Sequence, residues 1–358
     1  MINKILKWGI LGAARVNERL LPAIIEAPNS QLVAIASRRA GAAKATLEKY
    51  APKDFIKKHQ GNVVCYDDMD SLIHDKNIDA VYCPMANEEH AEWAIKAINA
   101  GKHVLIEKPM ATTLQDIDAI ETAAIKNKVK VMEGFMYRFH HQHARLAEIV
   151  ASGVIGDILS VRSSFSFLMR EARMYRINRS MADGGGALWD IGPYAIHTLR
   201  WGMGLNNHAS HLPFVEPLSC IATAKLNEHG ADIVTSGILD FGHDAKGRAR
   251  FGHFDVSFER SRKSEYELIG DKGWLKCHTV WAFDQDVPVI SWGNDAGENG
   301  EEKLKPANHF TLEITHFSDC VLNNKSPLLS FADARANCIA LEMCVLQASI
   351  DAASGGIK

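Results

Sequence analysis

The chain has 358 residues, of which 47% are hydrophobic and 23% charged, and its formal net charge is −3. This length exceeds that at which one hydrophobic core keeps growing, so we expect about two domains. No apolar run approaches the roughly 18 residues of a membrane span, and no long basic run suits a phosphate backbone. We therefore expect neither a membrane nor a nucleic acid as a partner.

The seven cysteines are widely scattered, and none stands in a Cys-x-x-Cys pair. This pattern is typical of reduced thiols. The apolar segment at the start of the chain is interrupted by Lys7 and soon followed by Arg15. It favours a first strand over an export signal. Both features predict a cytoplasmic protein.

Strand-like segments alternate with helical stretches through the first part of the chain. The strand-like segments are 7–11, 32–37, 63–66, 80–83, 104–107 and 129–133. The clearest helical stretch is 88–99, where apolar residues recur at helical spacing before Gly101. This alternation predicts right-handed βαβ units, an α/β fold with a doubly wound parallel sheet, and a dinucleotide-binding Rossmann domain over residues 1–130.

The turn after the first strand is a weakened dinucleotide fingerprint. Against the pattern Gly-x-Gly-x-x-Gly, Gly12 holds the first place, Ala14 the second and Asn17 the third. Gly12 permits a tight turn, and small residues let backbone N–H groups approach a pyrophosphate. The candidate contacts are Gly12, Ala13, Ala14, Arg15 and Val16. By itself, the motif fits an ordinary strand-to-helix turn equally well.

The end of the second strand bears on the choice of cofactor. An NAD site needs a carboxylate for the ribose 2′-hydroxyl, whereas an NADP site needs a cation for the 2′-phosphate. The strand ends in Ser37 and Arg38, with no acid. A hydroxyl and a planar guanidinium suit a phosphate, so the sequence favours NADP(H) over NAD(H).

The fifth strand ends in Glu107, Lys108 and Pro109. Ligands of open α/β folds bind at the carboxyl ends of parallel strands. Lys108 is therefore a candidate catalytic cation. A surface lysine before a helix-breaking proline is the alternative interpretation of this run alone.

From about Gly153 the pattern changes to strands with polar alternation. The segments are 158–167, 219–226, 233–241, 253–258, 264–269 and 273–277, with turn residues at 242–244 and 270–273. They predict hairpins in a large, mainly antiparallel open sheet. Apolar residues at helical spacing predict a closing helix over 331–352. We assign residues 131–358 to an α+β domain for substrate binding and oligomerisation.

The most informative stretch of this half is 184–197, which begins with three glycines. Asp190, Tyr194 and His197 follow at positions i, i+4 and i+7, one face if the segment is helical, and Pro193 places the helix start near Ile191. Such residues are more often hydrogen-bonding groups of a core than catalysts.

A second cluster, of histidines, stands at His140, His141 and His143. These residues lack partner ligands at zinc spacing, so we expect no metal and leave their role open.

Taken together, these motifs resemble the glucose-fructose oxidoreductase and inositol dehydrogenase family, known as the Gfo/Idh/MocA family. The resemblance covers nearly the whole chain. It rests on the Gly12 turn and on segments 36–38, 84–90, 107–109, 133–140 and 184–197. Many members carry a histidine four residues after the aspartate, where this chain has Tyr194. The chain thus resembles the tyrosine-bearing branch, similar to dimeric dihydrodiol dehydrogenase and glucose-fructose oxidoreductase.

The resemblance implies where cofactor and substrate contacts lie. Further cofactor contacts would be Pro84, Asn87, His90, Glu107 and Lys108, and substrate contacts would be Lys108, Asp190, Tyr194 and His197. Relatives vary at the position of His197. Here His141 replaces a proline common in this branch, and Ala14 and Asn17 replace glycines of the fingerprint. A homodimer or homotetramer is also implied.

The resulting hypothesis is an NADP(H)-dependent oxidoreductase that transfers a hydride between the nicotinamide and a sugar, polyol or related cyclic diol. A free tyrosine has a pKa of about 10, so Tyr194 needs a nearby cation to exchange protons near neutral pH. Lys108 would supply that charge, and Asp190 would orient the lysine or a substrate hydroxyl. The alternatives are a non-catalytic NADP-binding regulatory protein of the same fold and a redox-neutral nicotinamide-dependent glycosidase.

Overall fold

The computed structural model describes residues 4–59, 62–206, 214–281 and 287–355. The chain divides into two compact units, the first formed by residues 1–140 and 308–335 and the second by residues 141–307 and 336–358. The first unit therefore extends past the expected boundary at residue 130 and includes a distant segment.

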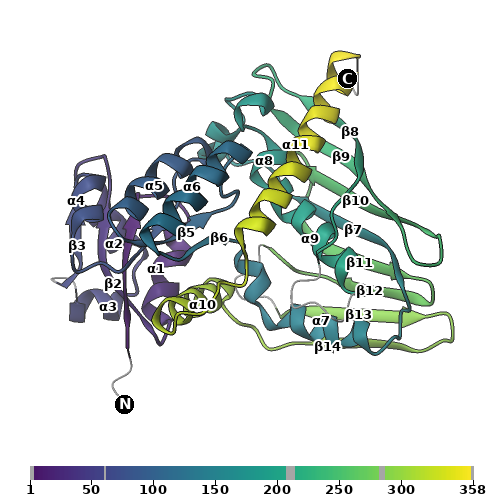
Figure 1. The fold of residues 1–358 in the computed structure, drawn as a ribbon, viewed down its shortest axis with the longest axis horizontal. Helices are drawn as coiled ribbons and strands as arrows, with labels where there is room; N and C mark the ends of the chain where they lie inside the picture. Colours follow the sequence, from purple (N-terminus) through teal and green to yellow (C-terminus); the bar gives the residue numbers. More distant parts are fainter. Residues whose placement is uncertain (1–3, 60–61, 207–213, 282–286, 356–358) are drawn as a thin grey trace. The chain divides into compact units, whose positions relative to one another are not determined.

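A six-stranded parallel sheet forms the centre of the first unit (Figure 1). Its strands are β1 (Leu6–Leu11), β2 (Ser30–Ala36), β3 (Val64–Tyr66), β4 (Ala80–Cys83), β5 (His103–Glu107) and β6 (Val131–Gly134). Their order is β3-β2-β1-β4-β5-β6, that of a Rossmann fold, and it confirms the predicted class. All four residues of β4 are buried, so the sheet is covered on both faces. β6 belongs here because it pairs with β5.

Helices and short 3₁₀ segments connect these strands. They are α1 (Asn17–Glu26), α2 (Ala42–Tyr50), α3 (Lys53–His59), α4 (Met69–His74), η2 (Asn87–Glu89), α5 (His90–Asn99), α6 (Leu114–Asn127) and η3 (Met136–Phe139). The predicted helix over 88–99 corresponds to η2 and α5 together.

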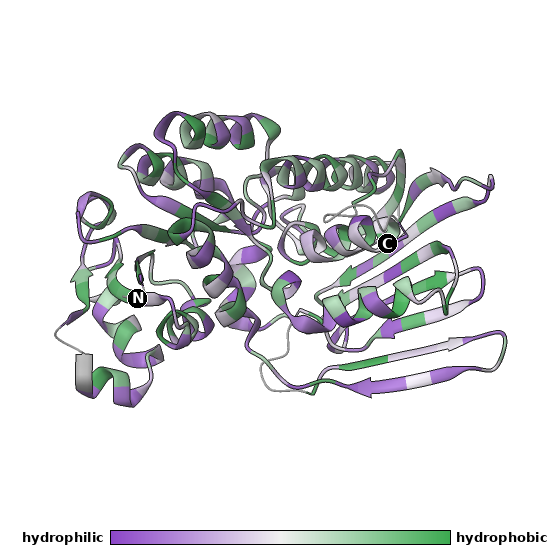
Figure 2. Ribbon diagram, turned by 60° about the horizontal axis from the view of Figure 1, so that its bottom comes forward, coloured by the Kyte–Doolittle hydropathy of each residue, from purple (hydrophilic) through white to green (hydrophobic). Residues whose placement is uncertain are grey.

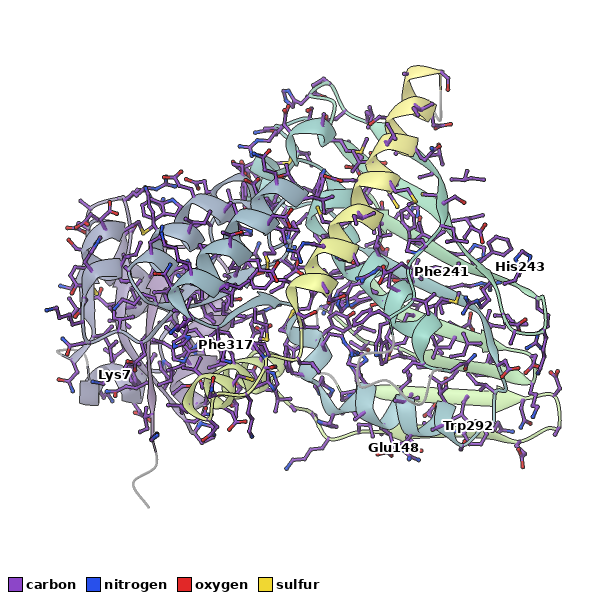
Figure 3. All side chains as sticks on the ribbon, in the orientation of Figure 1. Lys7, Glu148, Phe241, His243, Trp292 and Phe317 are labelled. Atoms are coloured by element: carbon purple, nitrogen blue, oxygen red, sulfur yellow. The ribbon has the colours of Figure 1, made fainter. Side chains whose placement is uncertain are left out.

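Helix α10 (His309–Leu322) joins the first unit from far along the sequence. The indole of Trp8 on β1 donates a hydrogen bond of 3.1 Å to the Ser318 hydroxyl, and its ring lies 5.6 Å from that of Phe317. Figure 3 labels Phe317 on this helix. Asn29 donates a second hydrogen bond of 2.9 Å to the Thr315 carbonyl. These buried contacts make α10 part of the first core.

The second unit is built on an eight-stranded sheet. Its strands are β7 (Ile158–Ser166), β8 (Ser219–Leu226), β9 (Asp232–His243), β10 (Ala249–Ser257), β11 (Lys263–Gly270), β12 (Gly273–Cys277), β13 (Val289–Asn294) and β14 (Asn299–Lys303), in the order β14-β13-β12-β11-β7-β10-β9-β8. β7 and β10 pair in parallel and the other neighbours are antiparallel, which confirms a mainly antiparallel sheet.

The sequence analysis missed β13 and β14. The Asn299–Lys303 strand carries Glu301, Glu302 and Lys303, and its residues alternate between exposed and partly exposed. Without an apolar face, it gives no strand signal. It is an edge strand, where charged residues discourage pairing with other chains.

Helices cover one face of this sheet. They are α7 (His141–Ala151), η4 (Glu171–Arg176), η5 (Met181–Asp183), α8 (Ala187–Asp190), α9 (Gly192–Gly204) and most of α11 (Phe331–Ala353). Along β8, Cys220, Ala222 and Ala224 are buried, whereas Ser219 before them and Ile221 between them are exposed. Figure 2 shows hydrophobic and hydrophilic residues interspersed along the strands, as expected for a sheet with one buried face.

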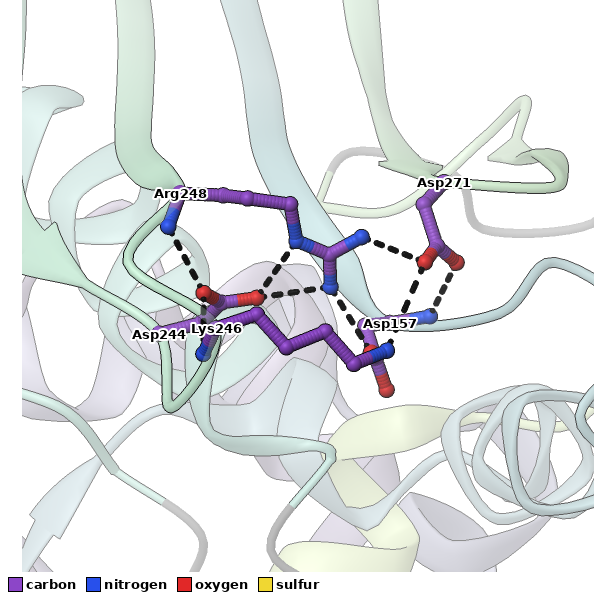
Figure 4. Close-up of polar contacts among 5 residues, drawn as sticks. All are labelled: Asp157, Asp244, Lys246, Arg248 and Asp271. Carbon is purple, nitrogen blue, oxygen red and sulfur yellow. Dashed lines mark hydrogen bonds and ion pairs between the residues drawn. The ribbon is translucent and has the colours of Figure 1, made fainter.

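A cluster of five charged residues links three segments of the second unit (Figure 4). The Arg248 guanidinium donates to Asp244, Asp157 and Asp271 at 2.5 to 2.7 Å. Lys246 donates a further bond of 2.7 Å to Asp157. Hydrogen bonds from Lys246 and then Arg248 hold the pKa of the Asp157 carboxyl below its usual value. The cluster links the β9–β10 turn, the start of β7 and the β11–β12 turn.

In the described part of the chain, α11 is the one helix long and apolar enough to cross a membrane. The sequence analysis found no such run, because charged residues interrupt the helix. Arg335 pairs with Asp118 and Glu121 of α6, and near the other end Thr223 donates a hydrogen bond of 2.5 Å to Asp351. Both ends thus make polar contacts with folded protein.

Candidate functional site

The glycine turn of the first unit begins where β1 ends. Gly12 adopts φ +120°, and its N–H donates a hydrogen bond of 2.9 Å to the Ala36 carbonyl of β2. A side chain would be strained at this φ. The amide of Asn17 donates a hydrogen bond of 2.8 Å to the Gly12 carbonyl. Asn17, which stands at the third glycine position of the fingerprint, thus fixes the turn through its side chain.

The residues between Gly12 and Asn17 remain accessible. Ala13, Ala14 and Val16 are partly exposed and Arg15 is exposed. No side chain caps the amino end of α1. A helix start approached by a glycine turn and left without a side-chain cap suits a pyrophosphate, which backbone N–H groups and the helix dipole stabilise. The residues present therefore fit a dinucleotide.

The end of β2 provides the predicted cation. Arg38 is exposed and forms a two-pronged ion pair with Glu89, with N–O distances of 2.6 and 3.1 Å. Ser37 is buried, and its hydroxyl accepts a hydrogen bond of 3.1 Å from the Arg39 N–H. Ser37 therefore shapes this turn, while Arg38 presents the charge. The pairing with Glu89 escaped the sequence analysis because 51 residues separate the two.

The turn that carries Lys108 is held by three separate interactions. Glu107 accepts a hydrogen bond of 2.5 Å from the Tyr82 hydroxyl, and a ring nitrogen of His90 lies 2.7 Å from the Pro109 carbonyl oxygen. The Met110 N–H donates to Glu133 at 2.8 Å. The Lys108–Pro109 peptide bond is cis.

These contacts bring together three segments that the sequence analysis named separately. The other ring nitrogen of His90 lies 3.0 Å from the Met85 carbonyl oxygen, so His90 bridges the loop after β4 to the turn after β5. Pro84 and Asn87 of the β4 loop are buried, and Lys108 is only 7% exposed. Lys108 thus lies in a tightly packed turn, unlike a lysine on an ordinary solvated surface.

Helix α10 contributes two buried titratable groups that the sequence analysis missed. Burial, and then the charge of Glu107, raises the pKa of Glu313 well above its usual value. Burial, with Arg19 and His140 nearby, lowers the pKa of His309 to about 3. Both shifts favour the uncharged form of the side chain. An acid at an apolar position of an amphipathic helix is the signal that could have revealed Glu313.

The second unit holds Asp190, Tyr194 and His197. Asp190 ends α8, and Ile191 separates it from α9, which starts at Gly192 with Pro193 in its first turn, as predicted. Asp190 is buried and pairs with Arg173 at 2.9 Å and Arg176 at 3.2 Å. These arginines, which lie in the short η4 segment, were not predicted from the sequence, because the glycine run separates them from Asp190 and no motif pairs the two segments.

The Tyr194 ring packs in an aromatic group, 5.8 Å from the ring of Phe165 and 6.3 Å from that of Trp281. This residue is 8% exposed. His197 is fully buried, and its ring lies 5.0 Å from Phe214. In this unit, His197 therefore lies in the core, which suits packing better than substrate contact.

Three glycines and one buried acid position this segment. A side chain at Gly185 would overlap the Arg179 carbonyl, and one at Gly186 would overlap the carboxyl of Asp232. Asp232 accepts hydrogen bonds from the Leu188 N–H at 2.8 Å and the Thr235 hydroxyl at 2.6 Å. It thereby caps the start of α8 from β9. Close packing thus explains Gly185 and Gly186, whereas Gly184 adopts a left-handed φ of +82°.

The histidine cluster separates at the unit boundary. His140 is buried at the end of the first unit, whereas His141 begins α7 and is exposed. His143 is buried, and its Nδ1 lies 2.9 Å from the Tyr266 hydroxyl. Among the described residues, no group of three or more His, Cys, Asp or Glu is arranged to hold a metal ion.

A hollow of about 620 Å³ in the second unit lies beside α7 and the β13–β14 hairpin, with Glu148 and Trp292, both labelled in Figure 3, among its lining residues. No predicted site residue lines it.

Comparison with known proteins gives two family matches. Residues 6–135 match an oxidoreductase family with an NAD-binding Rossmann fold, and residues 143–276 match the GFO/IDH/MocA C-terminal domain. An uncharacterized oxidoreductase of Rhizobium meliloti is 31% identical over 90% of this chain and 91% of its own. The D-xylose 1-dehydrogenase (NADP(+)) 2 of Haloferax volcanii is 28% identical over 89% of this chain and 90% of its own.

A solved structure is similar throughout. It is a 3-ketoreductase from Actinomadura kijaniata in complex with TDP-benzene and NADP, 25% identical, with a TM-score of 0.77 over 95% of this chain and 96% of that one. The same ketoreductase was solved as one mutant with phenylalanine for a tyrosine and another with alanine for a lysine.

The buried carboxyl of Asp232 gives a pH-dependent prediction. Burial raises its pKa from 3.8 to about 6. The folded protein therefore holds a proton that the unfolded chain releases, so this contribution to stability is complete below about pH 4 and is lost as pH rises through about 6. Asp232→Asn keeps an acceptor for Leu188 and Thr235 but cannot ionise. Its stability relative to the wild type should rise by roughly 2 kcal/mol between pH 4 and pH 7.

Urea unfolding at both pH values measures this difference. Asp240→Asn, a partly exposed acid on the same strand, is the matched control. Equal pH dependence of the Asp232→Asn and wild-type proteins would contradict the assignment.

Proposed function

Because the chain belongs to the Gfo/Idh/MocA oxidoreductase family, we propose that it transfers a hydride between NADP(H) and a sugar, polyol or related cyclic diol. The chain is an NAD(P)-dependent oxidoreductase by this membership, and the NADP named for its relatives favours NADP over NAD. Those relatives also act on sugar-like substrates, as their names state. The observation that carries the proposal is the anchored Lys108 turn at the carboxyl edge of the Rossmann sheet.

Cofactor binding would use the turn 12–16 for the pyrophosphate and Arg38 for the 2′-phosphate. His90, which contacts the Lys108 turn, would line the nicotinamide side of this site together with Pro84 and Asn87 of the same loop. NADP, when bound, supplies hydride exchange at C4 of its nicotinamide. The protein's own groups then have to hold the substrate and move one proton.

We assign the proton transfer to Tyr194 and the stabilisation of a substrate alkoxide to Lys108. A fixed ammonium group near a developing negative oxygen lowers the energy of the transition state. The residues substituted in the two ketoreductase mutants, a tyrosine and a lysine, are of the same types as Tyr194 and Lys108.

Asp190 has a different role in this proposal from the one expected from the sequence. Its carboxylate already faces Arg173 and Arg176, so its charge is compensated within the second unit. We propose that the main role of Asp190 is to fix the start of α9, which carries Tyr194. Substrate binding would be a lesser role of this residue. His197, buried in the core, would support the same helix.

The experiment that tests the function is a substrate panel. The purified protein is mixed with NADP⁺ or NADPH and with aldoses, polyols, ketosugars or aromatic trans-diols, and nicotinamide absorbance is followed in both directions. A change with one class supports the proposal. Tight NADPH binding with no turnover would favour a regulatory protein, and product release without net absorbance change would favour a redox-neutral glycosidase.

Two substitutions test the catalytic assignment. Lys108→Ala and Tyr194→Phe should each lower kcat at least roughly tenfold, the low end of a general acid–base contribution, with little change in NADPH affinity. Lys126→Ala and Tyr50→Phe change the same residue types outside the proposed site and should keep wild-type turnover. Wild-type kcat in both test variants would refute the assignment.

Arg38 determines cofactor choice in this proposal. Arg38→Ala should raise the KM for NADP roughly tenfold, because a hydrogen bond to a charged group contributes about 1.5 kcal/mol or more. The KM for NAD should change little. Lys44→Ala removes an exposed cation from the neighbouring helix α2 as the control. An equal loss for NADP and NAD would show that Arg38 does not recognise the 2′-phosphate.

The quaternary structure proposed is a homodimer or homotetramer, formed through the exposed face of the eight-stranded sheet. Ile221, Ile238, Phe251 and Trp274 are 39 to 75% exposed there. Light scattering should give a mass two or four times that of the chain, and Ile221→Lys should lower it. Ile125→Lys, at an exposed position of α6 in the first unit, should not. A wild-type monomer would remove the proposal.

A further inference from the structure

Two cysteines of the second unit lie together although they are 124 residues apart in sequence. Cys220 belongs to β8, at the edge of the sheet, and Cys344 to α11. Their sulfur atoms are 3.5 Å apart. Cys344 is fully buried, whereas Cys220 is 7% exposed. The pair thus lies in the layer between helix and sheet, with one member nearer to solvent.

A second contact fixes the register of helix and strand. Thr223 donates a hydrogen bond to Asp351. Thr223 lies three residues after Cys220 on the strand, and Asp351 lies seven residues after Cys344 on the helix. Three strand residues span about 10 Å and seven helical residues about 10.5 Å. The helix therefore runs alongside the strand over this stretch, and the sulfur contact is part of an ordered interface.

Other buried cysteines have different neighbours. Cys277 contacts the side chain of Gln142 and the Thr279 carbonyl, and Cys320 contacts His316 and the Ser326 carbonyl. A disulfide has a sulfur–sulfur distance of about 2.05 Å. The sulfurs of Cys220 and Cys344, at 3.5 Å, need to approach by only about 1.5 Å to reach this distance.

We propose that Cys220 and Cys344 are an oxidation site, which a hydroperoxide such as hydrogen peroxide converts into an intrachain disulfide. The Cys220 thiolate attacks one oxygen of hydrogen peroxide, and the O–O bond breaks. The other oxygen departs as hydroxide and is protonated to water, and Cys220 becomes a sulfenic acid. The Cys344 sulfur then attacks the Cys220 sulfur, the S–O bond breaks, and a second water leaves. The thiols together lose two electrons and two protons, and the peroxide is reduced to two waters.

The surroundings of the two sulfurs decide which of them reacts first with the peroxide. The hydrogen bond with Cys344 lowers the pKa of the Cys220 thiol, whereas burial raises the pKa of Cys344 well above its usual value. The thiolate is the reactive form of cysteine. Cys220, the more accessible of the two, is therefore the attacking residue, and Cys344 resolves the sulfenic acid.

The test uses the full-length protein, hydrogen peroxide and an alkylating reagent. After oxidation and alkylation in denaturant, the wild-type protein should show two fewer alkylated cysteines than the seven of the reduced chain. Non-reducing peptide mapping should find the peptide of Cys220 joined to that of Cys344, and dithiothreitol should separate them. This mapping needs no variant, so it does not depend on whether a variant folds.

Three variants complete the experiment. Cys220→Ser and Cys344→Ser should each abolish the linked peptide, whereas Cys338→Ser, on the same helix, should retain it. In Cys344→Ser, Cys220 should accumulate as the sulfenic acid, which a dimedone reagent traps. Links between other cysteines, links between chains, or seven alkylated cysteines after peroxide treatment would each overturn the proposal.

Discussion

Burial of the central parallel strands on both faces is the constraint on which the first unit depends. No residue of β4 and none of Val104, Leu105 or Ile106 in β5 is in contact with solvent. Polar chemistry is therefore excluded from the middle of the sheet and confined to the strand ends. The turns after β1, β2, β4 and β5 meet at one edge because parallel strands all end there. Gly12, Arg38, His90 and Lys108 follow these four strands.

Several buried or partly buried carboxyls of this protein accept hydrogen bonds from specific backbone and side-chain groups. The buried carboxyl of Asp232 accepts hydrogen bonds from α8 and β9 in place of water. Because it lies against Gly186, a side chain at position 186 would overlap it. Glu107 and Glu133 fix the Lys108 turn in the same manner. Leaving such groups unsatisfied would be costly. They therefore fix the geometry of the turns more precisely than apolar packing alone would.

The sequence predicts those parts of the fold whose signals are local. The strands at 80–83 and 219–226 lie where the pattern places them, because apolar periodicity marks their buried faces. Parallel order follows from alternation with helices. By contrast, the strand Asn299–Lys303 carries only polar residues, so its pairing with β13 is visible only in the sheet.

The individual residues of the candidate site could be predicted from the sequence, but the residues with which they form ion pairs could not. Lys108, Arg38 and Asp190 stand in motifs, whereas their partners do not. Glu89 and Arg173 are ordinary surface charges until the chain folds them beside Arg38 and Asp190. The burial of His197 likewise depends on packing around α9, which a spacing of i, i+4 and i+7 does not reveal.

The membership of α10 in the first unit has a consequence for biosynthesis. Trp8 emerges from the ribosome some 300 residues before Phe317 and Ser318, which cover it. At about 5 to 20 residues per second, that interval lasts on the order of 15 to 60 seconds. Throughout it the amino-terminal core is incomplete, and by its end the residues that form the second unit's sheet, 158–303, have been synthesised. The second unit is completed later still, because it takes most of α11 from the chain after residue 335. Each unit therefore needs a segment that is made only after the body of the other unit.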